Sequence, residues 1–184
     1  MARLRSKYLE EIRPQLAKDL GIKNFNALPR IKKITVSCGV GGAKDNKKLL
    51  TNAISILEKI SGQKAVATRA KLSVAQFRLR QGMAIGARVT LRGDRMYEFL
   101  DRLVNVVIPR IRDFRGLRLR FDGHGNYNMG LTEQSVFPEV GTELLESTQG
   151  MNIAITIANG SSEKSASLLR AFSFPLKQEE AAVA

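Results

Sequence analysis

Several short segments place apolar and polar residues alternately, and this pattern constrains the fold more than any other feature of the chain. Ile34, Val36 and Cys38 alternate with polar residues, and the same period of two recurs at residues 84–92, 117–121 and 151–157. Alternation buries one side of a strand and leaves the other side in solvent. The pattern therefore predicts a sheet with one buried and one polar face, and a further short strand is expected at residues 65–68.

Segments with a single apolar stripe lie between these strands. They are typical of amphipathic helices at residues 4–20, 45–62, 93–108 and 162–172, and Pro14 leaves open whether the first is one helix or two. Such helices and strands assemble most simply in two layers. The expected fold class is α+β, with a mostly antiparallel sheet, helices packed on one face and a polar, basic open face. We expect one domain over residues 1–177 and a disordered tail at residues 178–184.

The charge of the chain indicates a polyanionic partner. Lys and Arg number 30 against 17 Asp and Glu, a formal net charge of +13. Residues 69–92 contain six basic residues and no acidic one. Unmixed positive charge repels itself unless phosphates neutralise it, so this stretch is interpreted as a nucleic-acid contact. Its central part, residues 71–82, is expected to project as a loop between two strands; whether Phe77 stacks on a base stays open.

The polar positions of the predicted strands favour one kind of nucleic acid. Alternation places on the open face Lys33, Thr35, Ser37, Arg88, Thr90, Arg92, Arg118, Arg120 and Thr156. Sheets that bind single-stranded RNA expose aromatic side chains, which this face lacks. Hydroxyl and guanidinium groups suit the shallow minor groove of structured, double-helical RNA. No expected helix has the pattern of a DNA major-groove reader.

Other function classes have little support in the sequence. The single Cys38 excludes a disulfide framework and is predicted to be buried and inert. Residues 39–44 are glycine-rich but lack the spacing of a nucleotide-binding loop, and we expect instead a tight turn with free amides close to an RNA backbone. Asp122 with His124 is typical of a turn rather than a metal site. We expect no enzyme activity, no cofactor and no metal. No signal or membrane-spanning segment is recognised, so a cytoplasmic protein is expected. A nucleotide-dependent or RNA-modifying enzyme and a membrane-surface protein are the alternatives.

A set of motifs resembles a known family. PRIKKITVSCGVG, KLSVAQFRLRQG, RIRDFRG, FDGHGNYNMG and FSFP occur in this order, and over residues 1–176 the chain resembles the bacterial family of the fifth protein of the large ribosomal subunit. The resemblance implies a structural protein, not an enzyme, that binds 5S ribosomal RNA. It further implies attachment of that RNA to 23S ribosomal RNA in the central protuberance, beside other ribosomal proteins there.

The resemblance also implies which residues bind the 5S RNA. In the family this RNA lies on the open sheet face, and the matching positions include Ser37, Gln63 and Thr90. Together with the outward positions of the strands, the expected 5S contacts are Lys33, Thr35, Ser37, Gln63, Arg88, Thr90 and Arg92. The family commonly has Asn where this chain has Ser37, and a hydroxyl offers fewer hydrogen bonds than an amide.

Two further contacts are implied by the resemblance. The projecting loop corresponds to one that reaches transfer RNA in the P site, and its expected contacts are Lys71, Ser73, Gln76, Phe77, Arg78, Arg80 and Gln81. The family also contacts the small-subunit head protein numbered thirteen in an intersubunit bridge. The expected bridge residues are Arg110, Arg112, Asp113, Arg115, Glu133 and Glu139. No membrane partner is implied.

Overall fold

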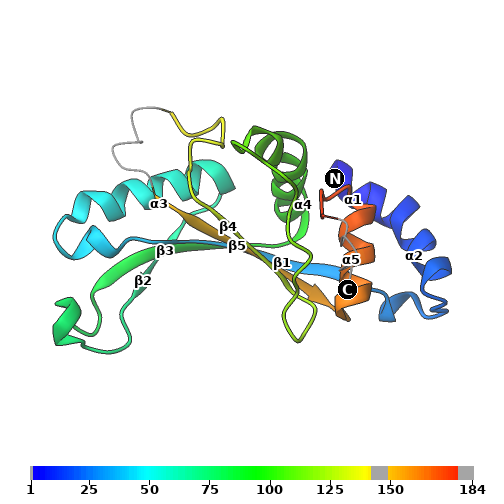
Figure 1. Ribbon diagram of the computed structural model, residues 1–184, viewed down its shortest axis with the longest axis horizontal. Coiled ribbons are helices and arrows are strands. Elements are labelled where there is room, and N and C mark those ends of the chain that lie inside the picture. Colours follow the sequence, from blue (N-terminus) through cyan, green and yellow to red (C-terminus); the bar gives the residue numbers. More distant parts are fainter. Residues whose placement is uncertain (1, 142–148, 178–184) are drawn as a thin grey trace, which may run out of the picture. The chain divides into compact units, whose positions relative to one another are not determined.

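The computed structural model describes residues 2–141 and 149–177 and has an α+β architecture (Figure 1). Among these residues, five strands form an antiparallel sheet in the order β2-β3-β1-β5-β4. The strands are β1 (Arg30–Gly39), β2 (Val66–Arg69), β3 (Ala84–Leu91), β4 (Tyr127–Leu131) and β5 (Met151–Ala158). The α-helices are α1 (Arg3–Lys7), α2 (Arg13–Asp19), α3 (Lys47–Ser61), α4 (Gly93–Arg102) and α5 (Ser162–Ala171). The expected α+β class with an antiparallel sheet is confirmed, and the polar, basic open face stays a prediction.

The chain divides into two compact units whose boundaries fall inside β1, β4 and β5 and at the end of β3. Residues 35–91 and 130–153 belong to one, which we call the hairpin unit. The described residues 2–34, 92–129 and 154–177 belong to the other, the helical unit. The single domain over residues 1–177 stays a prediction. The tail expected to be disordered, residues 178–184, lies outside the described residues.

In the hairpin unit, α3 begins and ends where the sequence predicts. The Asn46 side chain accepts a hydrogen bond of 3.0 Å from the Lys48 N–H, which satisfies a free donor of the first turn. Gly62 ends the helix with φ of 62°, a conformation that only glycine adopts at little cost. The buried stripe includes Ile56, Leu57 and Ile60, and it packs on β3.

A hairpin joins β2 to β3 with antiparallel pairing. Val66 lies opposite Arg88, and Thr68 lies opposite Gly86. A Cβ atom at Gly86 would lie 2.7 Å from the Cys38 carbonyl oxygen and 2.7 Å from Thr68 Oγ1. Real side chains do not come this close, so the three strands β2, β3 and β1 approach one another here because residue 86 is glycine.

In the helical unit, the chain stays helical from Arg3 to Asp19. A π-helical segment, Tyr8–Ile12, separates α1 from α2, and Pro14 lies in the first turn of α2. Proline lacks an N–H and its ring crowds the carbonyl four residues earlier, so an ordinary α-turn is not available there. The wider π turn absorbs this disruption. Pro14 therefore modifies the helix without breaking it in two.

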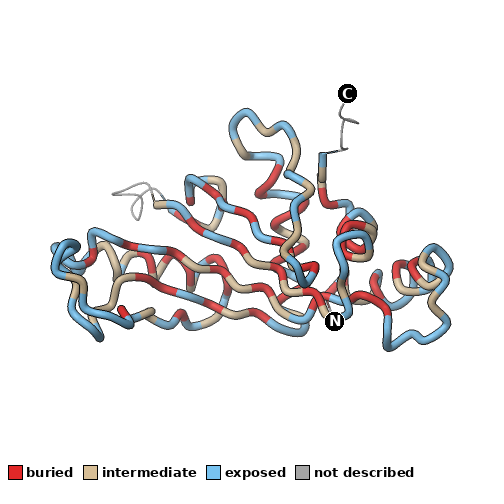
Figure 2. The backbone as a smooth tube through the Cα atoms, turned by 60° about the horizontal axis from the view of Figure 1, so that its bottom comes forward, coloured by how far each residue is buried: buried red, intermediate tan, exposed pale blue. Residues whose placement is uncertain are grey.

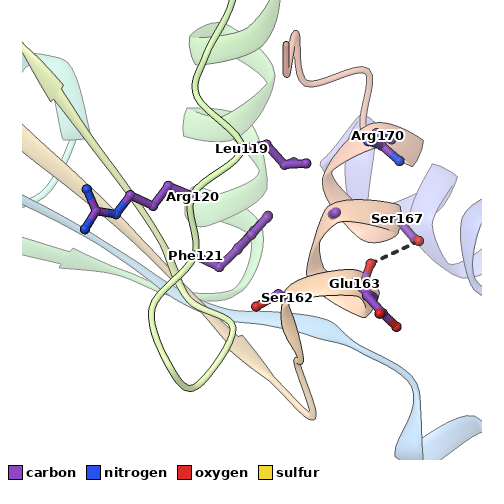
Figure 3. Close-up of a pocket in the computed structure, with 8 residues that line it drawn as sticks. Leu119, Arg120, Phe121, Ser162, Glu163, Ser167 and Arg170 are labelled. Atoms are coloured by element: carbon purple, nitrogen blue, oxygen red, sulfur yellow. Dashed lines mark hydrogen bonds between the residues drawn. The ribbon is translucent and has the colours of Figure 1, made fainter. Parts of the chain in front are cut away.

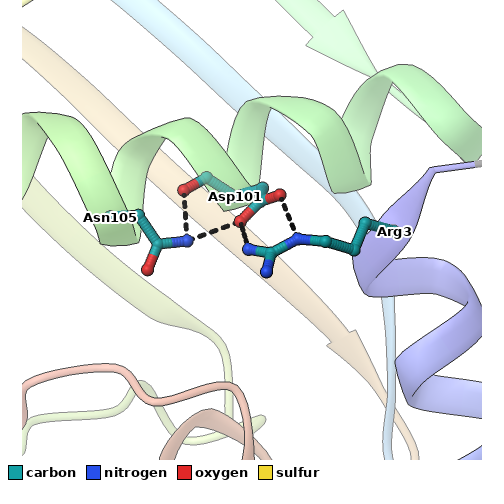
Figure 4. Close-up of polar contacts among 3 residues, drawn as sticks. All are labelled: Arg3, Asp101 and Asn105. Carbon is teal, nitrogen blue, oxygen red and sulfur yellow. Dashed lines mark hydrogen bonds and ion pairs between the residues drawn. The ribbon is translucent and has the colours of Figure 1, made fainter.

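Polar contacts tie the N-terminal helix to α4 within the helical unit (Figure 4). The Arg3 guanidinium donates two hydrogen bonds to the Asp101 carboxylate, of 3.1 and 2.6 Å. Asn105, one helical turn further along, donates to the same carboxylate. In the core of the same unit, Tyr8 and Phe172 stack with ring centroids 5.9 Å apart, and the buried Tyr97 has its ring centroid 6.4 Å from that of Tyr8.

Residues 117–121 do not form the expected strand. Leu117 and Phe121 each make one isolated bridge, to Leu176 and Tyr127, and no ladder connects them. Leu119 and Phe121 instead point toward α5, whereas Arg120 points away (Figure 3). The alternation is real, but its apolar side faces a helix rather than belonging to a sheet. The expected position of Arg118 and Arg120 on the open sheet face is therefore wrong, although both are exposed.

β4 was not expected, because its residues belong to a Gly- and Asn-rich motif typical of a turn. Only the first part of that motif turns: the Asp122 carboxylate accepts hydrogen bonds from the backbone N–H groups of His124 (2.9 Å) and Asn126 (2.7 Å). The Asn126 side-chain amide also donates to this carboxylate, at 2.7 Å, and this bond, together with the backbone bonds, favours the charged form and lowers the pKa of Asp122. Asp122 is thus a turn residue, as expected. The strand itself has alternate buried residues, beginning at Tyr127.

Candidate nucleic-acid interface

In the hairpin unit, β1 from Thr35 to Cys38 and β3 from Ala87 to Leu91 alternate as the sequence predicts (Figure 2), whereas Gly86, at a polar position of the pattern, is buried. Their apolar residues Val36, Cys38, Val89 and Leu91 are buried. The residues between them point away from this core, and they are Thr35, Ser37, Arg88 and Thr90. Arg88 is exposed and the three hydroxyl residues are half-buried. A guanidinium and several hydroxyls are thereby brought onto neighbouring strands.

Gln63 lies beside this group, although it belongs to the connection after α3. Its side-chain amide donates a 3.2 Å hydrogen bond to the Thr90 carbonyl oxygen. Its backbone N–H donates to Ser61 Oγ, at 3.2 Å, where the left-handed Gly62 turns the chain. Gln63 and Thr90, named from separate parts of the sequence, are therefore adjacent in the structure.

Lys33 and Arg92, the other two expected contacts, belong to the helical unit. Lys33 is half-buried on β1, two residues before Thr35, and Arg92 is the exposed residue that precedes α4.

The sequence did not single out β2 as part of this surface. Val66, opposite Arg88, is 65% exposed, and Thr68 is half-buried beside Gly86. A strand of four residues gives too short a pattern to show which side faces the core. The two faces of β2 are assigned by its pairing with β3, whose alternation is clear in the sequence.

The loop at residues 71–82 extends the β2–β3 hairpin. Its base is closed by the Ala70 N–H donating to Met83 O and the Gly82 N–H donating to Ala70 O, at 2.8 and 3.0 Å. Val74 and Leu79 form a bridge beyond it, and a 3-10 turn, Ala75–Phe77, makes the tip. All seven residues expected to contact transfer RNA are exposed. The projecting loop is confirmed; its contacts stay a prediction.

Phe77 lies at the tip rather than beneath the loop. It is 59% exposed, and its carbonyl oxygen accepts a 3.4 Å hydrogen bond from Lys44 Nζ. Lys44 belongs to the glycine-rich turn after β1, so the tip rests against that turn. Arg78 follows with φ of 54°, a left-handed conformation that is uncommon for residues other than glycine.

The glycine-rich turn differs from expectation in one respect. Its amides were expected to be free for a phosphate, but Ala43 donates to Val40 O, and Asp45 and Asn46 both donate to Gly42 O. A 3-10 turn, Gly41–Lys44, uses these donors itself. Those three amides are therefore not available to an RNA backbone.

The expected bridge residues lie in both units and are described separately. In the helical unit Arg110, Arg112, Asp113 and Arg115 are exposed, and Asp113 has φ of 53°. In the hairpin unit Glu133 is exposed and accepts a hydrogen bond from Ser135 Oγ. Glu139 is half-buried, and its Oε2 atom is in the interior. Glu133 is thus the more accessible of the two acids.

Cys38 is buried, as its place in the alternation predicts. Its thiol donates to the Gly150 carbonyl oxygen at 3.1 Å, and the Gln134 amide lies 3.7 Å from the sulfur. Burial raises the pKa of the thiol, which disfavours the reactive thiolate. Within residues 2–141 and 149–177, no group of three or more His, Cys, Asp or Glu side chains is arranged to hold a metal. In that same part of the chain, no helix is long and apolar enough to cross a membrane.

Comparison with known families accounts for both halves of the chain. Residues 24–80 match the family model of ribosomal protein L5, and residues 84–176 match the model of the C-terminus of the same ribosomal family. The chain belongs to the ribosomal protein L5 family. Proteins of the L5 family are structural components of the ribosome and not enzymes, so the expectation of no enzyme activity is confirmed.

Relatives in the L5 family resemble the chain over nearly its whole length. A protein of Psychrobacter arcticus is 51% identical over 178 residues, which are 96% of this chain and 100% of the relative. One from Natranaerobius thermophilus is 48% identical over 176 residues, 95% of this chain and 98% of the relative. Both are named large ribosomal subunit protein uL5. The resemblance derived from the motifs is confirmed.

Proposed function

We propose that the chain is a constituent of the large ribosomal subunit and binds 5S ribosomal RNA through the hairpin unit. The surface consists of Thr35, Ser37, Gln63, Arg88 and Thr90. Lys33 and Arg92, which belong to the helical unit, are further proposed contacts. The proposal rests above all on one observation: hydroxyl and guanidinium side chains lie on neighbouring strands, and Gln63 is bonded to the backbone of Thr90.

The chemistry of this surface supports structured RNA as the ligand. Hydroxyl side chains donate and accept hydrogen bonds, as the 2′-hydroxyl groups of an RNA minor groove require. Arg88 supplies a fixed charge for phosphates. The described outward residues of β1, β2 and β3 include no aromatic side chain for stacking bases. Shape and backbone recognition of a double helix therefore fits better than reading of a single strand.

Thr90→Val tests this surface. The substitution keeps the shape of the side chain and the backbone carbonyl that Gln63 uses, and it removes only the hydroxyl. We expect 5S affinity in filter binding to fall by about 1 kcal/mol, roughly fivefold. Thr51→Val is the matched control, since Thr51 is exposed on α3, away from the strands. Equal affinity for the wild type and Thr90→Val, with both folded, argues against the site.

The same protein would attach 5S RNA to 23S ribosomal RNA in the central protuberance, beside other ribosomal proteins there. The net charge of +13 supports contact with more than one RNA segment, because each phosphate contact needs a basic residue and releases counterions. In this proposal the chain works in the cytoplasm, within the ribosome.

The exposed loop at residues 71–82 is proposed to contact P-site transfer RNA. It carries Lys71, Arg78 and Arg80 with no acidic residue, and it projects beyond the strands that hold the 5S surface. The remaining proposed contacts are Ser73, Gln76, Phe77 and Gln81. The Ser73 hydroxyl already accepts the Gln81 N–H at 2.9 Å, so these two residues shape the loop as well.

We assign the intersubunit bridge to two charged segments. One contains Arg110, Arg112, Asp113 and Arg115; the other contains Glu133 and Glu139. Opposite charges on exposed side chains attract only weakly in water. Weak attraction suits this bridge, because the contact with the small-subunit head protein thirteen must slide. Glu133 is expected to contribute more than the half-buried Glu139.

A further inference from the structure

Phe25 is an exposed aromatic side chain that the proposed function leaves unused. It lies on the segment between α2 and β1, in a 3-10 turn, Phe25–Ala27, and is 52% exposed. Among the described residues, Phe77 is the other phenylalanine exposed to a similar degree, and it belongs to the proposed transfer RNA loop. Phe99, Phe137, Phe172 and Phe174 are buried.

The backbone that carries Phe25 is anchored on both sides. Asn24 Oδ1 accepts a 2.9 Å hydrogen bond from the Asn26 N–H, which caps the turn. The Asn26 carbonyl oxygen accepts a 2.8 Å bond from Asn159 Nδ2 in the same unit. Leu28, three residues after Phe25, is only 1% exposed. The ring is therefore presented by a structured turn, and a ligand that stacks on it would lose little of its binding energy to ordering the loop.

Arg13 lies over this ring. Its guanidinium carbon is 5.1 Å from the ring centroid of Phe25, within the range of a cation–π contact. Residues 13–32 contain five basic residues, Arg13, Lys18, Lys23, Arg30 and Lys32, against Asp19 alone. Asn24 and Asn26 flank Phe25 in the sequence. An aromatic surface in basic, amide-rich surroundings matches the chemistry of sites that stack nucleobases beside a phosphate backbone.

We infer that Phe25, with Arg13, forms a stacking site for an unpaired RNA base. The site goes beyond the proposed function, because it lies in the helical unit, whereas the hydroxyl-rich surface of Thr35, Ser37 and Thr90 lies in the hairpin unit. It also recognises a different feature of RNA: that surface suits a double helix, whereas Phe25 requires a base outside a helix. An apolar protein partner is less suited, since the residues next to Phe25 are polar or charged.

The chain contains no tryptophan, so F25W introduces a single fluorescent reporter. Stacking of a base on the indole should quench its emission. We expect strong, saturable quenching by a single-stranded oligoadenylate of about twelve nucleotides, within the usual range of single-strand site sizes, and much weaker quenching by a duplex of the same length. L9W is the matched control: Leu9 is 42% exposed in the same unit but precedes Glu10 and Glu11. Equal quenching of F25W and L9W would overturn the inference.

Two substitutions separate stacking from charge. F25A should weaken oligoadenylate binding by about fivefold or more, the usual size of one base–aromatic stack. R13K keeps the charge and loses the planar group, so it should lower affinity while leaving the salt dependence unchanged. Circular dichroism confirms that each variant is folded. Affinity within about twofold of the wild type for folded F25A contradicts the site, because a lost stack costs more than that.

The source of the base is identified by separate titrations of F25W with 5S ribosomal RNA, fragments of 23S ribosomal RNA and transfer RNA. We expect quenching by one of the ribosomal RNAs, with a loss of affinity in F25A for that RNA alone. If F25W stays unquenched by every RNA and responds only to ribosomal proteins, the stacking site is refuted in favour of a protein contact. Thr90→Val should leave the F25W response to oligoadenylate unchanged, so failure of the 5S surface and failure of this site are distinguishable.

Discussion

At the scale of single residues, Gly86 is the glycine of the hairpin unit with the least room for a side chain. Gly86→Ala would push a methyl group to 2.7 Å from the Cys38 carbonyl oxygen, which belongs to the backbone of β1 and cannot rotate away. We expect a loss of about 1 to 3 kcal/mol in the free energy of unfolding, measured with urea. Gly39→Ala is the control, because nothing lies within 4 Å of its added atom. Equal stability of the two variants would contradict the close approach.

The buried Tyr97 is expected to affect the stability of the protein at alkaline pH. Burial, with a smaller effect of Tyr8, raises the pKa of Tyr97 to about 12 from its ordinary value of 10.0. The stability that this group contributes is therefore complete below about pH 10 and is lost as the pH rises toward about 12. Tyr97→Phe removes that loss. We expect the variant and the wild type to be similarly stable at about pH 8, and the variant to lose less stability at about pH 11, by urea unfolding. An equal loss in both would show that Tyr97 ionises as freely in the folded protein as in the unfolded chain.

At the scale of elements, the loop at residues 71–82 should be separable from the fold. Replacing residues 72–81 with a short Gly-Ser linker keeps Ala70, Gly82 and Met83, whose hydrogen bonds close the hairpin. The replaced residues are mostly exposed and none is buried, so little buried surface is lost. We expect a melting temperature within a few degrees of the wild type and unchanged 5S affinity. Collapse of 5S binding would place the RNA contact in the loop.

The charge of this loop should matter only on the ribosome. Arg78→Ala together with Arg80→Ala is expected to weaken retention of P-site transfer RNA, more at low salt than at high salt, because salt screens exposed charges. Retention that is insensitive to the double substitution at every salt concentration would contradict the proposed contact.

The sequence predicts an element correctly where the pattern of apolar and polar residues belongs to that element alone. β1, β3 and β5 follow alternation alone, and α3 follows its stripe together with Asn46 and Gly62. Alternation at residues 117–121 misleads, because it reports one apolar side without saying whether a strand or a helix covers it. β4 is hidden because Gly and Asn residues, typical of turns, form both the turn at Asp122 and the strand beside it.

At the scale of the whole molecule, the charge of +13 and the family motifs were enough to predict a ribosomal, RNA-binding protein. The division into two compact units was not predicted, since two of its boundaries fall inside β1 and β5, which are continuous in the sequence pattern. The proximity of Gln63 to Thr90 also depends on long-range pairing, because 27 residues separate them. No pattern in the sequence distinguishes Phe25. The proposed stacking site is identified from the exposure of the Phe25 side chain and from the position of Arg13 over its ring.

Binding of the purified chain to 5S ribosomal RNA, to transfer RNA and to a random duplex, each across a series of salt concentrations, tests the central claim most directly. A protein this basic binds any RNA at low salt, so discrimination must be measured near physiological salt. We expect 5S affinity to exceed that for the other two by at least about tenfold there, with Thr90→Val reducing the preference and Thr51→Val leaving it intact. Equal affinity for all three RNAs at every salt concentration would contradict the claim that this chain recognises 5S RNA.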